Sequence, residues 1–413
     1  MEDSAGFDHP RGRFLRLQLS LERIGPVSHG AFALTVPVRR ARLEGSESLS
    51  HPNASPIGPL HPAHKIEISV HLRPRSRRPL PGLEGSVFGS RAGYLSRQEL
   101  AGSHGARAGD VFRVESFASD HDLDVLSVSA ARRTMVLAGT ARAMSRAFGV
   151  ELVAYESHDG FHHAHAGPVS VPSGLESSIQ GVFGLDSRPL ARPHVRHFAA
   201  TMGRRRPQRF NPPEVATLYD FPPHLDGRDQ TVALLQLGGG FHPEDLHAYF
   251  RRLKMKPPAI EVVGVGRARN RPTGRPKSAD AEVCLDIEVA ASVAPGARLV
   301  VYFASNDDRG FIDGVKHAIH DTRYRPSVLS ISWGAPESQW TTRAIRVLDG
   351  AFREAGHLGV TVCASSGDLG SSDGLARGLA VEFPASSPHA LACGGTRLVA
   401  RNGRIRNEEV WHE

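Results

Sequence analysis

Four nearly continuous apolar runs in the second half of the chain limit the folds available to it. They cover residues 231–237, 299–303, 327–332 and 360–364, and helical patterns separate them. Strands that are apolar on both faces are typical of parallel sheets covered by helices on both sides. The pattern therefore predicts a doubly wound parallel sheet. In such sheets, sites gather just past the carboxyl ends of the strands.

The part of the chain before this sheet has a different pattern, with shorter alternating strands. The expected elements are a strand at 65–72, a helix capped by Ser96, a hairpin of 123–128 and 133–138, a helix at 140–148 and a strand at 151–155. The order strand, helix, strand, strand, helix, strand predicts a ferredoxin-like α+β module.

Composition divides the 413 residues into four parts. Residues 1–60 are rich in Pro, Arg and Ser and are expected to be poorly ordered. The module occupies residues 61–185, and a basic, Pro-rich linker covers 186–209, where proteases would cut most easily. Residues 210–413 contain the sheet.

The chain carries a net charge of +7, with Arg clusters at 75–78 and 204–206. Nucleic-acid binding is one interpretation, but both clusters are mixed with Pro and lack interleaved aromatic residues, so solvated linkers are favoured. No stretch is apolar for long enough to span a bilayer, and the N-terminus shows no secretory signal. We expect a monomer without a membrane or nucleic-acid partner.

Cysteine and histidine residues give weak signals for metal binding. Cys284, Cys363 and Cys393 have no CxxC spacing, which indicates neither a zinc site nor a disulfide framework, and the latter two fall in apolar strands where burial is expected. Four histidines lie within eight residues: His158, His162, His163 and His165. They could bind a metal. Alternatively, they could gain charge below about pH 6.5 and loosen the module from its partner.

Acidic residues give the strongest signal for a site. Glu282 and Asp286 are four apart in a predicted helix, which places both carboxyl groups on one face. Two like charges that close raise the cost of ionising both, so one tends to keep a proton in mild acid. Such a pair is often only a solvated face, but the apolar residues Val283, Leu285, Ile287 and Val289 leave few faces for solvent.

A third acidic residue, Asp368, lies in Ser-Gly-Asp-Leu-Gly directly after the apolar run 360–364. It could be a turn residue that bonds its own backbone. Its place past a strand end favours a site residue equally, and Trp333 follows another strand in the same way.

These residues lie in longer segments that resemble the sedolisin-type serine-carboxyl peptidases, most closely the prokumamolisin group. The similar segments are 281–297, 330–334, 366–370 and 383–388, with 95–99 and 147–150 in the N-terminal module. The resemblance runs from about residue 64 to the last residue. It implies a subtilisin-like fold that cleaves peptide bonds in acid outside the cell. The N-terminal module would be a propeptide that acts as chaperone and blocker and is removed within 186–209.

The resemblance also implies roles for the acids. Glu282 matches the general base toward the catalytic serine, Asp286 the residue that orients it, and Asp368 the oxyanion-hole acid, while Trp333 matches a tryptophan beside this network. A carboxylate near its own pKa accepts a proton in acid, where a histidine would stay protonated. A protonated Asp368 donates a hydrogen bond to the oxyanion, which an ionised one cannot do.

The chain departs from the family pattern in two ways. Gln236 stands where close relatives carry Glu, which removes one carboxyl group from the network. The family's nucleophile motif, Gly-Thr-Ser-Ala-x-x-Pro, and the calcium ligands expected beyond it are not found in this chain. The sheet is therefore expected to be incomplete, with an exposed edge that favours aggregation.

Two function classes follow. The first is a serine-carboxyl endopeptidase precursor whose remaining segment is missing, so that the chain as written shows no activity. The second is a catalytically silent homologue that acts as a binding or inhibitory protein.

Overall fold

The computed structural model describes residues 39–49, 54–76, 80, 93–158, 160–193, 208–275 and 278–411. We refer to residues 39–185 as the N-terminal module, to 186–193 as the connecting segment and to 208–411 as the C-terminal domain.

A parallel sheet of six strands forms the centre of the C-terminal domain. Its order is β12 (Ile260–Gly264), β13 (Arg298–Phe303), β11 (Thr231–Gln236), β14 (Val328–Ile331), β16 (Thr361–Ser365) and β18 (Leu391–Cys393). The four predicted apolar runs are β11, β13, β14 and β16. The edge strand β12, which is short and partly exposed, was not predicted. The apolar strand expected around Cys393 is β18, which is short and exposed.

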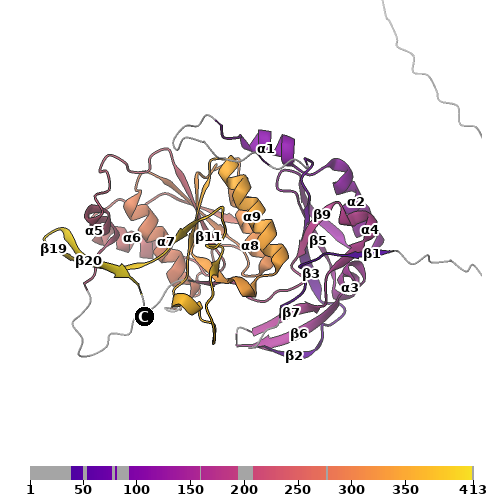
Figure 1. The fold of residues 1–413 in the computed structure, drawn as a ribbon. Helices are drawn as coiled ribbons and strands as arrows, with labels where there is room; N and C mark the ends of the chain where they lie inside the picture. Colours follow the sequence, from indigo (N-terminus) through magenta and orange to yellow (C-terminus); the bar gives the residue numbers. More distant parts are fainter. Residues whose placement is uncertain are drawn as a thin grey trace, which may run out of the picture. The chain divides into compact units, whose positions relative to one another are not determined.

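Helices cover both faces of this sheet (Figure 1). On one side, α8 (Asp308–Ile319) and α9 (Thr342–His357) pack on Ala233 and Leu235 of β11; on the other, α6 (Pro243–Arg252) and α7 (Ala279–Val293) pack on Leu234. Successive side chains of a strand point to opposite faces, so a strand apolar throughout feeds both cores. The predicted doubly wound architecture is confirmed.

Shorter elements surround the sheet. They are α5 (Pro212–Leu218), β15 (Trp333–Pro336), the 3₁₀ turns Glu337–Gln339 and Gly370–Ser372, β17 (Glu382–Phe383), and the hairpin of β19 (Thr396–Arg401) and β20 (Arg404–Val410).

The N-terminal module contains an antiparallel sheet in the order β4 (Asp124–Ser129), β5 (Thr134–Thr140), β3 (Lys65–Leu72) and β9 (Ile179–Phe183). Helices α1 (Arg97–His104) and α2 (Ala108–Asp120) connect β3 to β4, and α3 (Ala141–Phe148) and α4 (Ser173–Glu176) lie between β5 and β9. This is the ferredoxin-like order, as predicted.

The fourth strand of that sheet differs from the expectation. The run 151–155 is β6 (Glu151–Ser157), which pairs with β2 (Ala54–Pro59) and β7 (Gly160–Ala166) in a separate three-stranded sheet. Alternation identified β6 as a strand but carries no information about its partner.

Residues 1–60 were predicted to be poorly ordered, and this is wrong for two strands within them. Strand β2 is one, and β1 (Arg40–Arg42), which pairs with β8 (Ser170–Pro172), is the other. The Arg40 guanidinium donates to the backbone oxygens of Ala147 and Ser170, at 2.5 and 2.6 Å. Arg40, which contributes to the basic composition of this segment, therefore has a structural role. Residues 1–38 lie outside the described residues.

Buried polar contacts join the module to the C-terminal domain, where β3 packs against α8 and β9 against α9. His71 of β3 lies 3.2 Å from Asp313 through Nε2 and 3.0 Å from Lys316 Nζ through Nδ1. Arg133 pairs with Glu354, which also contacts His320. The two parts therefore share an ionisable interface.

Candidate active site

Helix α7 brings Glu282 and Asp286 to the carboxyl end of the sheet. Ser278 caps the helix by accepting the backbone N–H of Asp280. Val283 and Ile287 are fully buried between helix and sheet, which fixes the rotation of α7 about its axis. The spacing of four then directs both carboxyl groups toward the strand ends.

The outer side of α7 corrects one expectation. Leu285 and Val289 were expected to exclude solvent, but they are 40% and 42% exposed and line a surface groove beside α5. The acid pair is buried by the strand ends instead.

Glu282 is only 1% exposed, and its Oε2 atom has no hydrogen-bond partner among the described residues. A hydrogen bond joins its carboxyl group to that of Asp286, and Ser332 also contacts it. Burial, followed by the charges of Asp286 and Asp368, raises the pKa of Glu282 well above its ordinary range. This direction favours the protonated form of Glu282.

Asp286 lies in a polar setting made by two neighbouring strands. Gln236, at the end of β11, donates from Nε2 to Asp286 Oδ2 at 2.6 Å. Ser332, directly after β14, donates from Oγ to Oδ1 at 2.8 Å. Trp333 Nε1 donates to Gln236 Oε1 at 3.1 Å. Of the two supporting residues named from the sequence, Gln236 contacts Asp286 directly and Trp333 reaches it through Gln236.

Asp368 lies in the loop after β16, and its charge reaches both Glu282 and Glu382. The turn before it requires glycine, because Gly367 has φ +86° and a Cβ there would lie 2.9 Å from Glu382 Oε2. Ser366 anchors the loop by donating from its backbone N–H and its hydroxyl to the carbonyl of Cys393, both at 3.0 Å. The three acids predicted from the sequence therefore lie within electrostatic reach of one another.

Sequence reasoning missed three residues of this region: Ser332, Asp373 and Glu382. Glu382 and Asp373 are buried and hydrogen bonded to each other, and burial raises the pKa of Glu382. The signal for Ser332 was its place at a strand end beside Trp333. Glu382 gave no signal, because it belongs to the two-residue strand β17, which no periodicity reveals.

The connecting segment approaches the site along the edge of β15. Its last residues form β10 (Arg192–Pro193), antiparallel to β15, with Arg192 opposite Gly334 and Pro193 opposite Trp333. The Asn306 amide holds the segment just before β10, accepting from Ala191 N at 2.9 Å and donating to Ala191 O at 2.8 Å. The segment therefore runs toward the acid pair as an added strand.

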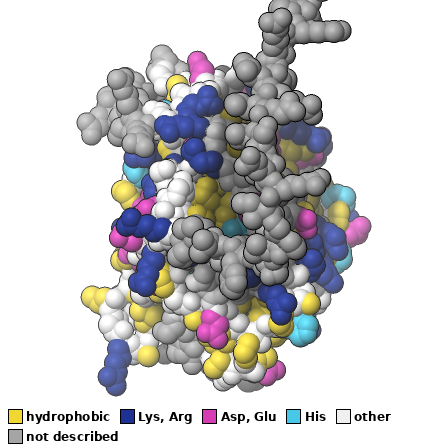
Figure 2. All heavy atoms as spheres, turned by 90° about the vertical axis from the view of Figure 1, so that its right-hand side faces the viewer, with side chains coloured by type: hydrophobic (Ala, Val, Ile, Leu, Met, Phe, Trp, Pro, Cys, Tyr) yellow, Lys and Arg dark blue, Asp and Glu magenta, His cyan; other side chains and the backbone are white. Residues whose placement is uncertain are grey.

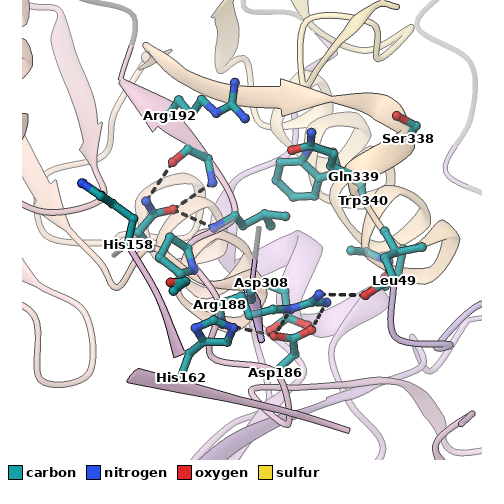
Figure 3. A pocket seen from close by; sticks show the side chains of 18 of the residues that line it. Leu49, His158, His162, Asp186, Arg188, Arg192, Asp308, Ser338, Gln339 and Trp340 are labelled. Atoms are coloured by element: carbon teal, nitrogen blue, oxygen red, sulfur yellow. Dashed lines mark hydrogen bonds and ion pairs between the residues drawn. The ribbon is translucent and has the colours of Figure 1, made fainter. Parts of the chain in front are cut away.

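A cavity of about 720 Å³ lies beside the connecting segment (Figure 3). Arg188 pairs there with Asp186 and donates to the carbonyl of Leu49 at 2.7 Å. Asp308 lies in the same wall, and burial raises its pKa to about 7. These contacts fix the start of the segment in the module.

The side chain of Arg192 lies near the buried acid pair Glu382 and Asp373. If Gly374 carried a Cβ, that atom would lie 3.3 Å from Arg192 Nη1. The positive charge of Arg192 lowers the pKa of Glu382 and so opposes the effect of burial. Asp373 forms a hydrogen bond with Glu382. A Cβ at Gly334 would lie 2.2 Å from Glu382 Oε1, so the glycine lets β15 and this acid pair approach closely.

The histidines of the module do not behave as predicted. His162, His163 and His165 are buried on β7. Burial lowers the pKa of His163 to about 4 and lowers that of His165. The expected gain of charge below about pH 6.5 is therefore wrong for these two residues, whereas His71 lies in the interface with α8.

Other ligand classes find little support among the described residues. In the part of the chain that the structure describes, no group of three or more His, Cys, Asp or Glu side chains is arranged to hold a metal ion, so the calcium implied by the resemblance has no ligand set there. Among the same residues, no helix is long and apolar enough to cross a membrane.

Basic side chains are scattered on the face that Figure 2 shows. Lys and Arg lie in separate groups among hydrophobic, acidic and other side chains. A nucleic-acid interface gathers them along one stripe or groove. The described part of this face therefore gives that interpretation no support.

Cys393, expected to be buried, is exposed on the edge strand β18.

Comparison with known proteins places this geometry in a family. The sequence profile described as "Pro-kumamolisin, activation domain" matches residues 52–188. Kumamolisin from Bacillus sp. (strain MN-32) is 42% identical over 389 residues, which cover 91% of this chain and 70% of kumamolisin. The chain belongs to the sedolisin-type kumamolisin family.

Two further similarities are more distant. Sedolisin from Pseudomonas sp. (strain 101) is 25% identical over 385 residues, covering 87% of this chain and 65% of sedolisin. A solved structure of Pseudomonas sedolisin superposes on this chain with a TM-score of 0.44 at 26% identity. The superposition covers 49% of this chain and 58% of that one. That structure is described as a serine-carboxyl proteinase in complex with two molecules of pseudo-iodotyrostatin. The similarity to kumamolisin makes the chain a member of a peptidase family, and the profile match assigns residues 52–188 to the activation domain.

Proposed function

We propose that the chain is the precursor of an acid-active serine-carboxyl endopeptidase. Glu282 is its general base toward a serine, Asp286 supports that base, and Asp368 is the oxyanion acid. The observation that carries the proposal is the meeting of these three carboxyl groups at the strand ends, with Glu282 buried and the partner-free Oε2 atom available for a serine hydroxyl. A carboxyl pair that shares one proton can still accept a proton from a serine in acid, where a histidine base would stay protonated. We also place the enzyme outside the cell.

The nucleophilic serine, we further propose, is not among the described residues. Ser332 is the serine in contact with Glu282, but its hydroxyl is already bound to Asp286 at 2.8 Å. It lies at the base of the site, where it orients the pair and is not presented to a substrate. The chain alone should then be silent.

The activation domain acts as an intramolecular inhibitor in this proposal. Extended peptides bind proteases by adding a strand to an exposed edge, with backbone bonds for affinity and side-chain pockets for specificity. The pairing of β10 with β15 occupies that edge. Substrates would take the same path, and the charge of the Glu382–Asp373 pair near Arg192 favours peptides with a basic residue at this position.

A chimera tests the proposal. Residues 1–411 are joined to the C-terminal segment of kumamolisin that carries its nucleophilic serine, and cleavage of a fluorogenic peptide is measured from pH 3 to 7. We expect acid activity that Glu282→Gln lowers by about 10³-fold and Asp368→Asn by about 10²-fold. Glu288→Gln, on the same helix but in the groove beside α5, is the matched control and should keep the activity.

Two outcomes would contradict the proposal. A folded chimera without activity would remove the assigned roles. Acid proteolysis by residues 1–413 alone, lost in Glu282→Gln, would show that the nucleophile lies within the chain.

A further inference from the structure

Gln236 is a fully buried amide whose orientation is fixed by chemistry. The indole Nε1 of Trp333 can only donate, so the atom of Gln236 that it meets at 3.1 Å must be the amide oxygen. The NH₂ end then faces Asp286 Oδ2 at 2.6 Å. An NH₂ group can only donate, so this contact favours an ionised Asp286.

The two acids differ in how well they can carry a charge. Asp286 accepts from Gln236 and from Ser332 and is half-buried. Glu282 is 1% exposed, and one of its oxygens has no partner among the described residues. A charge is more costly where desolvation is complete and hydrogen-bond donors are fewer. The charge of the pair therefore belongs on Asp286, and its proton on Glu282.

We propose that Gln236 is a positioning residue whose oriented amide keeps Asp286 as the charged member of the pair and leaves the proton on Glu282. The use of this arrangement in catalysis rests on the proposed function. Among the described residues outside α7, Asp368 in the loop after β16 reaches Glu282, and its negative charge opposes ionisation of Glu282 further.

In this arrangement Asp286, and not Glu282, finally accepts the proton that the serine hydroxyl loses. A serine hydroxyl placed at Glu282 Oε2 gives its proton to that oxygen while Glu282 passes the proton it already holds to Asp286. The serine oxygen is then free to attack a carbonyl, Glu282 remains neutral, and Asp286 changes from anion to acid. No further proton donor or acceptor is required. Asp286 is the final acceptor, and Gln236 sets the pH range in which it is available.

The test is a carboxyl titration of the full chain by ¹³C NMR, with side-chain carboxyl labels in Asp or in Glu. Glu282→Gln and Asp286→Asn assign the two signals by their loss. In the unsubstituted chain we expect Glu282 to be protonated at pH 6 and Asp286 to be ionised. In Gln236→Leu we expect the midpoint of Asp286 to rise by about one unit or more, because a donor to its charged form is lost.

Gln208→Leu is the matched control. Gln208 also forms two amide hydrogen bonds, with the backbone of Ala400 at 2.9 and 3.0 Å, but neither partner belongs to the acid network. This variant should leave both midpoints unchanged. Gln236→Glu adds a carboxyl group beside Asp286 and should make the chain bind one more proton near neutral pH.

An ionised Glu282 with a protonated Asp286 in the unsubstituted chain would overturn the inference. Unchanged midpoints in folded Gln236→Leu would overturn it as well. If Gln236→Leu does not fold, Gln236→Glu and the labelled unsubstituted chain still decide. The titration needs no turnover, so an inactive chimera would remove the proposed peptidase roles and leave the proton assignment standing.

Discussion

The contact between His71 and Lys316 makes the docking of the activation domain sensitive to acid. His71 is fully buried on β3 and lies between two groups of α8. Its Nε2 faces Asp313 Oδ1, and its Nδ1 faces Lys316 Nζ. A neutral imidazole satisfies both, donating to the carboxylate and accepting from the amine. A protonated imidazole would present an N–H to the amine, and this contact would become repulsive.

The size of the effect follows from the pKa of His71. Burial, then the charge of Lys316, lowers it from 6.5 to about 4. A base whose folded-state pKa is depressed binds its proton more readily when unfolded, so stability is lost as pH falls from 6.5 to 4. At about 1.4 kcal/mol per pH unit, this loss is about 3 kcal/mol.

His71→Gln should remove that loss, because an amide does not titrate in this range. The assay is urea denaturation of the full chain, followed by tryptophan fluorescence at pH 6.5 and pH 4. The unsubstituted chain should lose about 3 kcal/mol more free energy of unfolding between these pH values than the variant. His224→Gln, at an exposed position, is the control and should behave like the unsubstituted chain.

The comparison is made between pH differences, so a general destabilisation by the glutamine does not affect it. Equal losses in the unsubstituted chain and in His71→Gln would refute the reasoning. They would show that His71 is already charged at neutral pH or is not buried between these groups.

Three further predictions concern other buried or exposed groups. Arg133→Met leaves Glu354 buried without its cation and should lower the free energy of unfolding by about 3–5 kcal/mol in urea titrations at pH 7; a change below about 1 kcal/mol would count against a buried pair. Because the pKa of Glu282 is raised in the folded state, the free energy of unfolding falls as pH rises above the pKa of an unfolded glutamate. Glu282→Gln should remove about 1.4 kcal/mol per pH unit of this loss. Parallel pH profiles of stability in the variant and the unsubstituted chain would contradict the raised pKa. Leu391 of the edge strand β18 is 58% exposed, so the chain should self-associate, and Leu391→Lys should shift it toward monomer in light scattering at micromolar concentration; identical mass distributions would argue against this edge.

Much of the C-terminal domain could be predicted because its information is local. Runs such as 231–237, apolar on both faces, are typical of buried parallel strands, and the spacing of Glu282 and Asp286 follows from one helix. The resemblance of longer segments then supplied roles for these acids and for Asp368.

The rest depends on contacts between distant residues. His71 and Lys316 lie 245 positions apart, and neither residue type indicates its partner. Glu382 belongs to a strand of two residues, and Ser332 gains its meaning only from α7 beside β14. For the same reason, alternation identified β6 as a strand but could not assign it to its sheet, and apolar neighbours could not show that Cys393 lies exposed at an edge.

The central claim is that the carboxyl groups of Glu282, Asp286 and Asp368 form one site around a buried proton. An experimental structure of the full chain at acidic pH tests it most directly. We expect the Gln236 amide within hydrogen-bond distance of Asp286, as here at 2.6 Å, with Glu282 sealed from solvent and Asp368 facing it. A structure in which these side chains point apart into bulk water would contradict the account.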